Sequence, residues 1–282
     1  MTVVGTLRKA VARWRDEGLV TLIRAALSRS RDRVKRRRLR RKYRYVSDDG
    51  MISVDPERIT HFLVEGRHPA TRYRVEKGLV TKHELIKAYF PVGFFRGAVL
   101  PGEWDRHGKA YHFDRVYRGI RNHYVEGVEW ERTEYGHQML LLDDLYDYSY
   151  FDRRISQCES LYRSLNRDGY EPAPRPERNV GVNVGRDGTL IFNNKDGHNR
   201  LALARVLGID RIPVVVVVRH ARWQALREEI AAAETIDELG DRARRHLDHP
   251  DVRSLHEFNR ADRSADSALD RLERFVDRSI AR

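Results

Sequence analysis

The sequence has one cysteine, Cys158, among its 282 residues. A single thiol cannot form an internal disulfide or a cysteine-rich zinc site, so a reducing, cytoplasmic setting is expected. Long hydrophobic runs are also scarce. The longest aliphatic run extends from Val214 to Val218, far short of the roughly 20 apolar residues that span a bilayer. No apolar segment followed by a small-residue cleavage site stands near the N-terminus, so no secretory signal is expected.

Hydrophobic residues make up 40% of the chain, with four Trp and thirteen Tyr, which is enough for a sizeable core. The net charge of +12 is distributed unevenly. Residues 1–44 hold 16 basic and 3 acidic residues, whereas the rest of the chain holds 38 basic and 39 acidic residues. The body of the protein is therefore nearly neutral, and the positive charge is a feature of the N-terminal segment.

Residues 1–45 are predicted to form a basic amphipathic helical arm. The helix over 3–27 is predicted from apolar residues at helical spacing, which begin with Val4, Leu7, Val11 and Trp14. Eleven basic residues follow from Arg29 to Arg44, with Asp32 as the one acidic residue. Residues 8–44 could follow the phosphates of a nucleic acid or lie on an anionic membrane surface. The alternative is a solvated arm that docks on a protein.

Residues 46–170 are predicted to be mainly helical, with a leading strand over 51–54. Asp55 and Pro56 are typical of a helix start. Further helices are predicted over 133–147 and from an N-cap at Asp152 to a stop at Gly169.

The segment 171–220 is predicted to form the core of the sheet. Alternating valines predict a half-buried strand over 180–184, and an Asp-Gly turn connects it to a strand over 189–192. An apolar helix follows from His198 to Leu207 and ends at Gly208. The run 214–218 predicts a strand that is covered on both faces. Helices are predicted for 221–282, so the expected fold class is α+β, with a small mixed sheet in a mainly helical protein.

The residues Asp196-Gly197-His198-Asn199-Arg200 lie at the predicted strand-to-helix junction and could form an anion cradle. The start of a helix offers unpaired backbone N–H groups and partial positive charge. Arg200 could donate two hydrogen bonds to a phosphate, and His198 could carry a proton near neutral pH. The alternative interpretation is purely structural: Asp196 caps the helix, Gly197 makes a turn, and His198 and Arg200 are surface groups.

The sequence FNNKDGHNRLA over 192–202, followed by Leu207-Gly208-Ile209 and by IPVVV over 212–216, resembles the conserved core of the ParB/sulfiredoxin superfamily (ParB-like N-terminal domain). The segment ISVDPERI over 52–59 is similar to the leading strand and turn of that family. The resemblance covers under a quarter of the chain.

This resemblance implies a nucleotide site, because the Gly-to-Arg motif of the family meets nucleotide phosphates at the start of a helix. Transferred by position, the resemblance makes Lys195, Gly197, Asn199 and Arg200 phosphate-binding residues, with His198 and Asp196 as candidate catalytic residues. A nucleoside triphosphate with Mg²⁺ is the expected cofactor or substrate. The sulfiredoxin nucleophile position is His198 here, so cysteine-based reductase chemistry is not expected. No helix-turn-helix of the chromosome-partitioning kind is recognised in 221–282.

The leading hypothesis is therefore a cytoplasmic, nucleotide-dependent phosphotransferase or hydrolase. Two alternatives remain: a nucleic-acid-binding protein that uses the basic arm, and a non-catalytic adaptor at a membrane surface. Two acidic pairs, Glu103 with Asp105 and Asp143 with Asp144, are weaker candidates for holding Mg²⁺, and they could equally face solvent.

Overall fold

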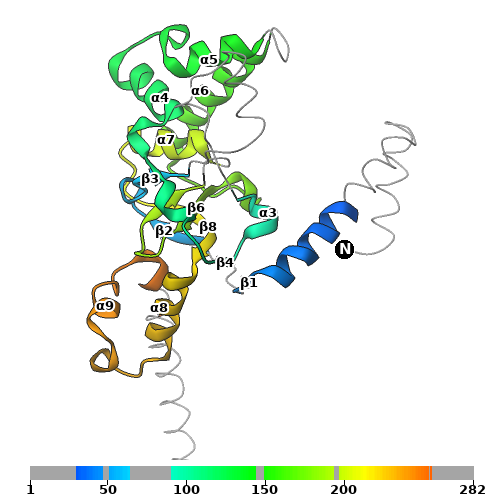
Figure 1. Cartoon of the computed structure of the whole chain (residues 1–282). Coiled ribbons are helices and arrows are strands. Elements are labelled where there is room, and N and C mark those ends of the chain that lie inside the picture. The colour runs from blue at the N-terminus through cyan, green and yellow to red at the C-terminus, as the bar shows by residue number, and fades with distance from the viewer. Residues whose placement is uncertain are drawn as a thin grey trace, which may run out of the picture. The chain divides into compact units, whose positions relative to one another are not determined.

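The computed structural model (Figure 1) describes residues 30–46, 51–63, 90–143, 149–193, 197–253 and 255. The chain divides into two compact units, Met1–Tyr45 and Val46–Arg282. In the first unit, residues 30–42 form a helix that is followed by the short strand β1 (Arg44–Tyr45). The predicted helix over 3–27 and the last part of the helical region predicted for 221–282, from residue 256 onward, lie outside the described residues.

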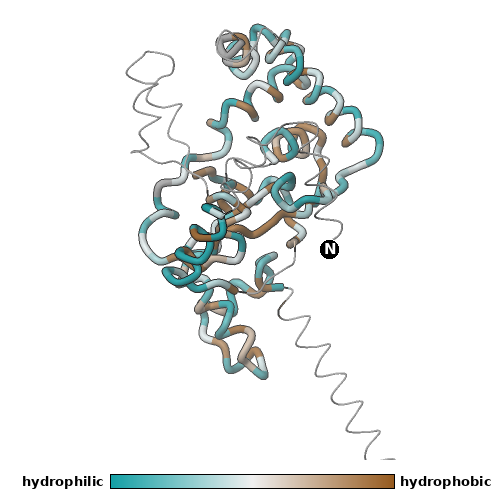
Figure 2. Tube along the Cα trace, turned by 90° about the vertical axis from the view of Figure 1, so that its right-hand side faces the viewer, coloured by the Kyte–Doolittle hydropathy of each residue, from teal (hydrophilic) through white to brown (hydrophobic). Residues whose placement is uncertain are grey.

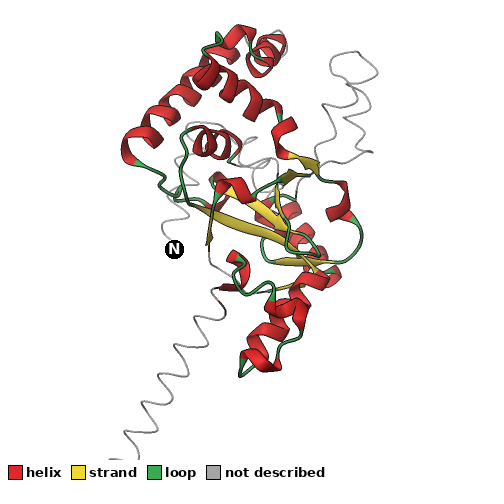
Figure 3. Ribbon diagram, turned by 90° about the vertical axis from the view of Figure 1, so that its left-hand side faces the viewer, coloured by secondary structure: helices red, strands yellow, loops and turns green. Residues whose placement is uncertain are grey.

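The second unit contains a mixed sheet flanked by helices, so the fold is mixed α/β. Its strands are β2 (Met51–Val54), β3 (His61–Phe62), β4 (Ala98–Leu100), β5 (Lys109–Ala110), β6 (Val180–Val184), β7 (Leu190–Phe192) and β8 (Ile212–His220). Along the sheet the order is β4-β8-β6-β7-β3-β5, and β2 pairs with β8. Figure 3 shows these strands between two groups of helices.

Strand β8 is the central strand of this sheet. It runs parallel to β6 along one edge; on the other edge it pairs antiparallel with β2 near its start and parallel with β4 near its end. All its residues except Pro213 are buried, which confirms the prediction that the run 214–218 is a strand covered on both faces. Hydrophobic residues are concentrated along these central strands (Figure 2).

The predicted order of strand, hairpin, strand, helix and strand over 180–220 is confirmed as β6, β7, α7 (His198–Val206) and β8. The prediction that 180–184 is half-buried is wrong, because all five residues of β6 are buried. Val180, Val182 and Val184 face the main core, while Gly181 and Asn183 on the other face are covered by Val217 and Asn193. The period-two pattern therefore reflects small and polar residues that pack inside the protein.

The remaining helices cover the sheet in two groups. The segments of 3₁₀ helix are η1 (Pro56–Arg58), η2 (Trp104–His107), η3 (Tyr111–Phe113), η4 (Trp130–Arg132), η5 (Pro176–Arg178) and η6 (Ile236–Glu238). The α-helices are α3 (Val92–Phe95), α4 (Arg115–Glu126), α5 (Glu134–Asp143), α6 (Tyr150–Asp168), α7, α8 (Ala221–Ala232) and α9 (Asp241–Arg244). Helices α4, α5 and α6 lie beyond α7, whereas α8 and α9 lie at the opposite side of the sheet (Figure 1).

Helices α4 to α7 share a second hydrophobic core next to the main one. It is built from Ile120, Trp130, Tyr135, Met139, Phe151, Ile155, Cys158, Leu165, Ala202 and Leu203. Because α7 contributes apolar residues to both cores, it joins this helical layer to the sheet. No helix in the described part of the chain is both long enough and apolar enough to cross a membrane.

Several expectations for 46–170 need correction. Only one strand was expected there, yet β3, β4 and β5 also come from this region and belong to the same sheet as β6–β8. These strands have only two or three residues, too few to show a periodic pattern. Helix α6 begins one turn earlier than expected, with Ser149 at the N-cap position, so Asp152 lies inside its first turn. Gly169 ends the helix as predicted, with φ 77°.

Candidate functional site

A cleft of about 710 Å³ opens beside the first turn of α7. One wall is α6, from Arg154 to Asp168, and another is the connector over 169–178. Gly197, His198, Asn199 and Arg200 form the part of the lining that comes from α7 and its N-cap. Four residues of the predicted cradle therefore border one open cavity, while Lys195 and Asp196 lie outside the described residues.

Gly197 is the N-cap residue of α7 and has a left-handed backbone, with φ 78°. A Cβ at this position would lie 2.5 Å from Val180 Cα and 2.8 Å from Asn179 C. The glycine thus lets the helix start approach the backbone of β6. Backbone atoms of Asn179 and Val180 therefore occupy the space that a side chain at Gly197 would need.

Arg200 is held at the edge of the cleft. Its Nη1 donates a hydrogen bond of 2.8 Å to the carbonyl oxygen of Glu171, and its guanidinium lies 5.4 Å from the ring centroid of Tyr170. Arginine stacks on aromatic faces and still presents further N–H donors in a planar fork. Arg200 is partly exposed, so the remaining edge of the guanidinium can meet a ligand in the cleft.

His198 is paired with an acidic residue that the motif does not contain. Its Nε2 donates a hydrogen bond of 2.9 Å to Asp114 Oδ1, and the Asp114 side chain is fully buried. The same carboxylate caps α4 by accepting hydrogen bonds from the backbone N–H groups of Val116 and Tyr117. Asp114 therefore fixes the orientation of the His198 ring relative to the cleft and would stabilise the ring when it is protonated.

Arginines supply the positive charge of the cleft. Arg154 and Arg178 line it together with Arg200. The Nε of Arg154 is buried and has no hydrogen-bond partner among the described residues, although its Nη1 donates to Gln157. A buried donor of this kind costs free energy unless a water or a ligand satisfies it.

Carboxylates line the cleft as well. Glu171 and Glu177 come from the connector, and Asp168 comes from the end of α6. The hydrogen bonds from Arg167 lower the pKa of Asp168. The cleft is therefore not uniformly basic, because α6 and the connector each contribute both an arginine and at least one carboxylate.

The connector keeps its place through one buried amide. Asn179 Oδ1 accepts from Ala173 N, and Asn179 Nδ2 donates to the carbonyl oxygens of Ala173 and Arg175. These three hydrogen bonds fold the connector against the start of β6, where Gly197 also packs. The connector and the start of α7 are thus both anchored at the same end of β6.

Neither Asp114 nor the arginines of α6 and the connector were identified as site residues from the sequence. Arg154 and Arg178 precede Asp196 by 42 and 18 residues, and no local pattern marks them. Asp114 carries a local signal for the start of a helix, because aspartate is a typical N-cap residue and caps α4. Gly127, with φ 70°, marks the end of the same helix. The contact of Asp114 with His198 depends on tertiary packing and has no local signal.

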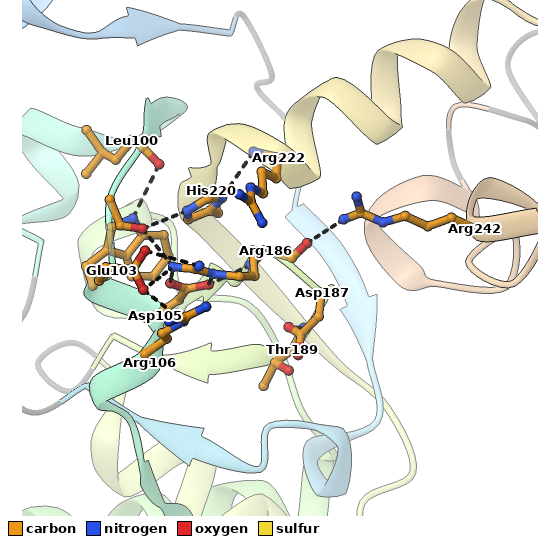
Figure 4. Close-up of polar contacts among 12 residues, drawn as sticks. Leu100, Glu103, Asp105, Arg106, Arg186, Asp187, Thr189, His220, Arg222 and Arg242 are labelled. Carbon is orange, nitrogen blue, oxygen red and sulfur yellow. Dashed lines mark hydrogen bonds and ion pairs between the residues drawn. The ribbon is translucent and has the colours of Figure 1, made fainter. Parts of the chain in front are cut away.

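A second polar cluster, shown in Figure 4, surrounds Arg186 in the turn between β6 and β7. Its guanidinium donates to both carboxylate oxygens of Asp105 and to the carbonyl oxygen of Gly102. It also forms an ion pair of 3.2 Å with Glu103. Burial raises the pKa of Asp105, but the hydrogen bonds from Arg186 outweigh it and leave that pKa below its usual value.

This cluster corrects the suggestion that Glu103 and Asp105 hold Mg²⁺, because an arginine already occupies both carboxylates. For the other acidic pair, Asp144 lies outside the described residues. Within the described ranges, no group of three or more His, Cys, Asp and Glu side chains is arranged to hold a metal ion. The Arg186 cluster is best explained as an anchor for the β6–β7 turn.

A buried network lies under α8. Asp251 is fully buried and accepts hydrogen bonds from Arg219 and from the Trp223 indole. His249 Nε2 donates to the carbonyl oxygen of Gly188, and its Nδ1 accepts from Asp251 N, which fixes the neutral ring. Burial lowers the pKa of His249 to about 4. The network joins the C-terminal part of the unit to the sheet and is remote in sequence from the cradle motif.

The chain matches no protein-family model, and comparisons with curated proteins and with solved structures found no significant match.

Proposed function

We propose that the chain is a nucleotide-binding protein of the ParB/sulfiredoxin type that transfers or hydrolyses the terminal phosphoryl group of a nucleoside triphosphate. The observation that carries the proposal is the cleft of about 710 Å³, which brings Arg154, Arg178 and Arg200 to the start of α7. Small-molecule sites commonly measure about 300–1,000 Å³. Guanidinium groups and a helix N-terminus together complement phosphate oxygens.

The residues present also fit the Mg²⁺ that accompanies a nucleoside triphosphate. This ion usually takes one or two carboxylates and completes its shell with phosphate oxygens and water. Glu171 and Glu177 line the cleft and would provide such carboxylates, whereas both carboxylate oxygens of Asp168 already accept hydrogen bonds from Arg167. When bound, the ion would neutralise part of the phosphate charge.

The protein would act mainly through positioning and charge. The backbone N–H groups at the start of α7 and Arg200 would hold the phosphate oxygens, while Arg154 and Arg178 would neutralise charge that develops in the transition state. In the transfer step, an acceptor oxygen forms a bond to the terminal phosphorus while the bond to the bridging oxygen breaks. The nucleoside diphosphate then leaves.

His198 would carry the proton that the acceptor hydroxyl or water loses. The buried carboxylate of Asp114, 2.9 Å from His198 Nε2, would stabilise the imidazolium that forms. This assignment gives the pair the role of a base and its orienting group.

Calorimetric titration with ATP, CTP, GTP and ADP, each with Mg²⁺, tests the proposal. At least one triphosphate should bind to the full chain. Arg200→Ala should weaken this binding about 10- to 100-fold, because hydrogen bonds to charged groups contribute about 1.5–3 kcal/mol. Arg163→Ala is the matched control, since Arg163 is an exposed arginine of α6 that does not line the cleft.

One further measurement completes this test. His198→Gln should slow phosphate release while the nucleotide still binds. The proposal fails if no nucleotide gives heat, or if Arg200→Ala binds as tightly as Arg163→Ala does.

A further inference from the structure

We propose that the helix over residues 30–42 binds the phosphate backbone of a nucleic-acid duplex. This interaction lies outside the nucleotide cleft and concerns the first unit alone. Nine side chains of the helix are basic and one, Asp32, is acidic. Every residue of the helix except Leu39 is exposed.

The positive charge lies on opposite faces of this helix. At about 100° per residue, the basic residues divide into one set with Arg31, Lys35, Arg38 and Lys42 and an opposite set with Arg33, Arg36 and Arg40. The two aliphatic residues, Val34 and Leu39, fall on different sides, and Val34 is 53% exposed. The helix therefore has no apolar stripe within its described residues.

This distribution favours a duplex over a lipid surface. A helix that lies on a membrane places an apolar face in the lipid and its basic residues on the other face. In contrast, the major groove of a duplex is about 12 Å wide, admits an α-helix, and carries phosphates along both walls. Unlike a lipid surface, a duplex groove presents phosphates to two opposite faces of a helix at the same time.

The charge density of the helix also suits a duplex. At about 1.5 Å per residue the helix is about 20 Å long, and a duplex carries one negative charge per roughly 1.7 Å of its axis. About twelve phosphates would therefore lie alongside nine basic side chains. Contacts with phosphates do not read bases, so the binding should be largely independent of sequence.

Fluorescence anisotropy of a labelled duplex of about 20 base pairs, mixed in sequence, tests the inference with the full chain. If five phosphates are neutralised, the affinity should fall about 500-fold between 50 and 200 mM salt. The variant Arg37→Gln/Arg38→Gln/Arg41→Gln keeps residues of similar helix propensity. It should bind the duplex at least tenfold more weakly at 50 mM salt. The slope of the logarithm of its affinity against the logarithm of the salt concentration should be shallower by about 2.7.

The control variant removes three exposed arginines from the second unit: Arg163→Gln/Arg222→Gln/Arg245→Gln. It should bind the duplex within about twofold of the unmodified protein, as should the cleft variant Arg200→Ala. The inference is overturned by absence of duplex binding at 50 mM salt or by an equal loss in either comparison variant. Co-sedimentation with phosphatidylserine vesicles gives a further test. The inference is also overturned if the protein binds these vesicles more tightly than the duplex and the helix variant no longer binds them.

Discussion

Alanine substitutions at the glycines that flank α7 should separate two structural reasons for a glycine: a left-handed backbone and a lack of space for a side chain. Gly197 and Gly208 both have left-handed backbones, with φ 78° and 64°. A Cβ at Gly197 would lie 2.5 Å from Val180 Cα, whereas a Cβ at Gly208 would meet nothing within 4 Å. The two substitutions share the backbone cost, and only Gly197→Ala adds a collision.

The magnitudes follow from these two contributions. A left-handed conformation costs an L-residue about 1–2 kcal/mol, so Gly208→Ala should lower the free energy of unfolding by about that amount. Overpacking against atoms that cannot rotate away adds about 1–3 kcal/mol. Gly197→Ala should therefore lose about 2–5 kcal/mol in total.

Urea denaturation followed by circular dichroism gives the unfolding free energy of each variant. Gly197→Ala should have a clearly lower midpoint than Gly208→Ala. Equal midpoints would refute the reasoning, because they would show that the backbone of β6 does not limit the space at Gly197. The glycine would then be better explained by room for a ligand.

Three further predictions concern buried groups. In urea denaturation, Asp114→Ala should lower the free energy of unfolding by about 1–2 kcal/mol, because α4 loses its N-cap. Asp114→Asn should recover most of this loss, since an amide side chain also caps a helix. Equal losses in the two variants would contradict the capping role of Asp114. Burial raises the pKa of Cys158 to about 12, so Ellman's reagent should react slowly with the native protein and rapidly in urea; fast native labelling would contradict the burial. Folding lowers the pKa of His249 to about 4, so between about pH 6.5 and pH 4 the unfolded chain binds more protons than the folded protein. The free energy of unfolding should therefore decrease by about 2 kcal/mol from pH 7 to pH 5. His249→Gln should reduce that pH dependence, and an unchanged dependence would count against it.

The segment 180–220 could be predicted from the sequence because its signals are local. The Asp-Gly turn, Gly208 and the valine run each carry a pattern of their own, and the structure has β6, β7, α7 and β8 in the expected order. The burial of β6 could not be predicted. Gly181 and Asn183 look like solvent-facing positions in an alternating pattern, and both are covered in the structure.

Helix α4 was missed although it is twelve residues long. Gly119 weakens the helical pattern in its middle, yet this glycine is required by packing, because a Cβ there would lie 2.3 Å from Tyr135 Cβ. Local propensity and tertiary contact therefore disagree at this position, and the tertiary contact prevails.

Half of the candidate site was visible in the sequence. The motif gave the residues at the start of α7, since a glycine followed by polar residues before an apolar helix is a local signal. The rest of the cleft depends on the approach of α6 and the connector to α7. This approach brings Glu171 next to Arg200 and Arg154 into the same cleft. The pairing of His198 with Asp114 joins positions 84 apart in sequence, and no spacing rule predicts it.

Hydrogen–deuterium exchange with and without a non-hydrolysable triphosphate and Mg²⁺ tests the location of the site most directly. Bound phosphate oxygens should slow exchange in peptides that cover 197–201, because their backbone N–H groups would become hydrogen-bonded, and also in peptides from the connector over 169–178. Protection in Arg163→Ala should equal that of the unmodified protein, and Arg200→Ala should lose most of it. Unchanged exchange at 197–201 under conditions in which the nucleotide is bound elsewhere would contradict the account.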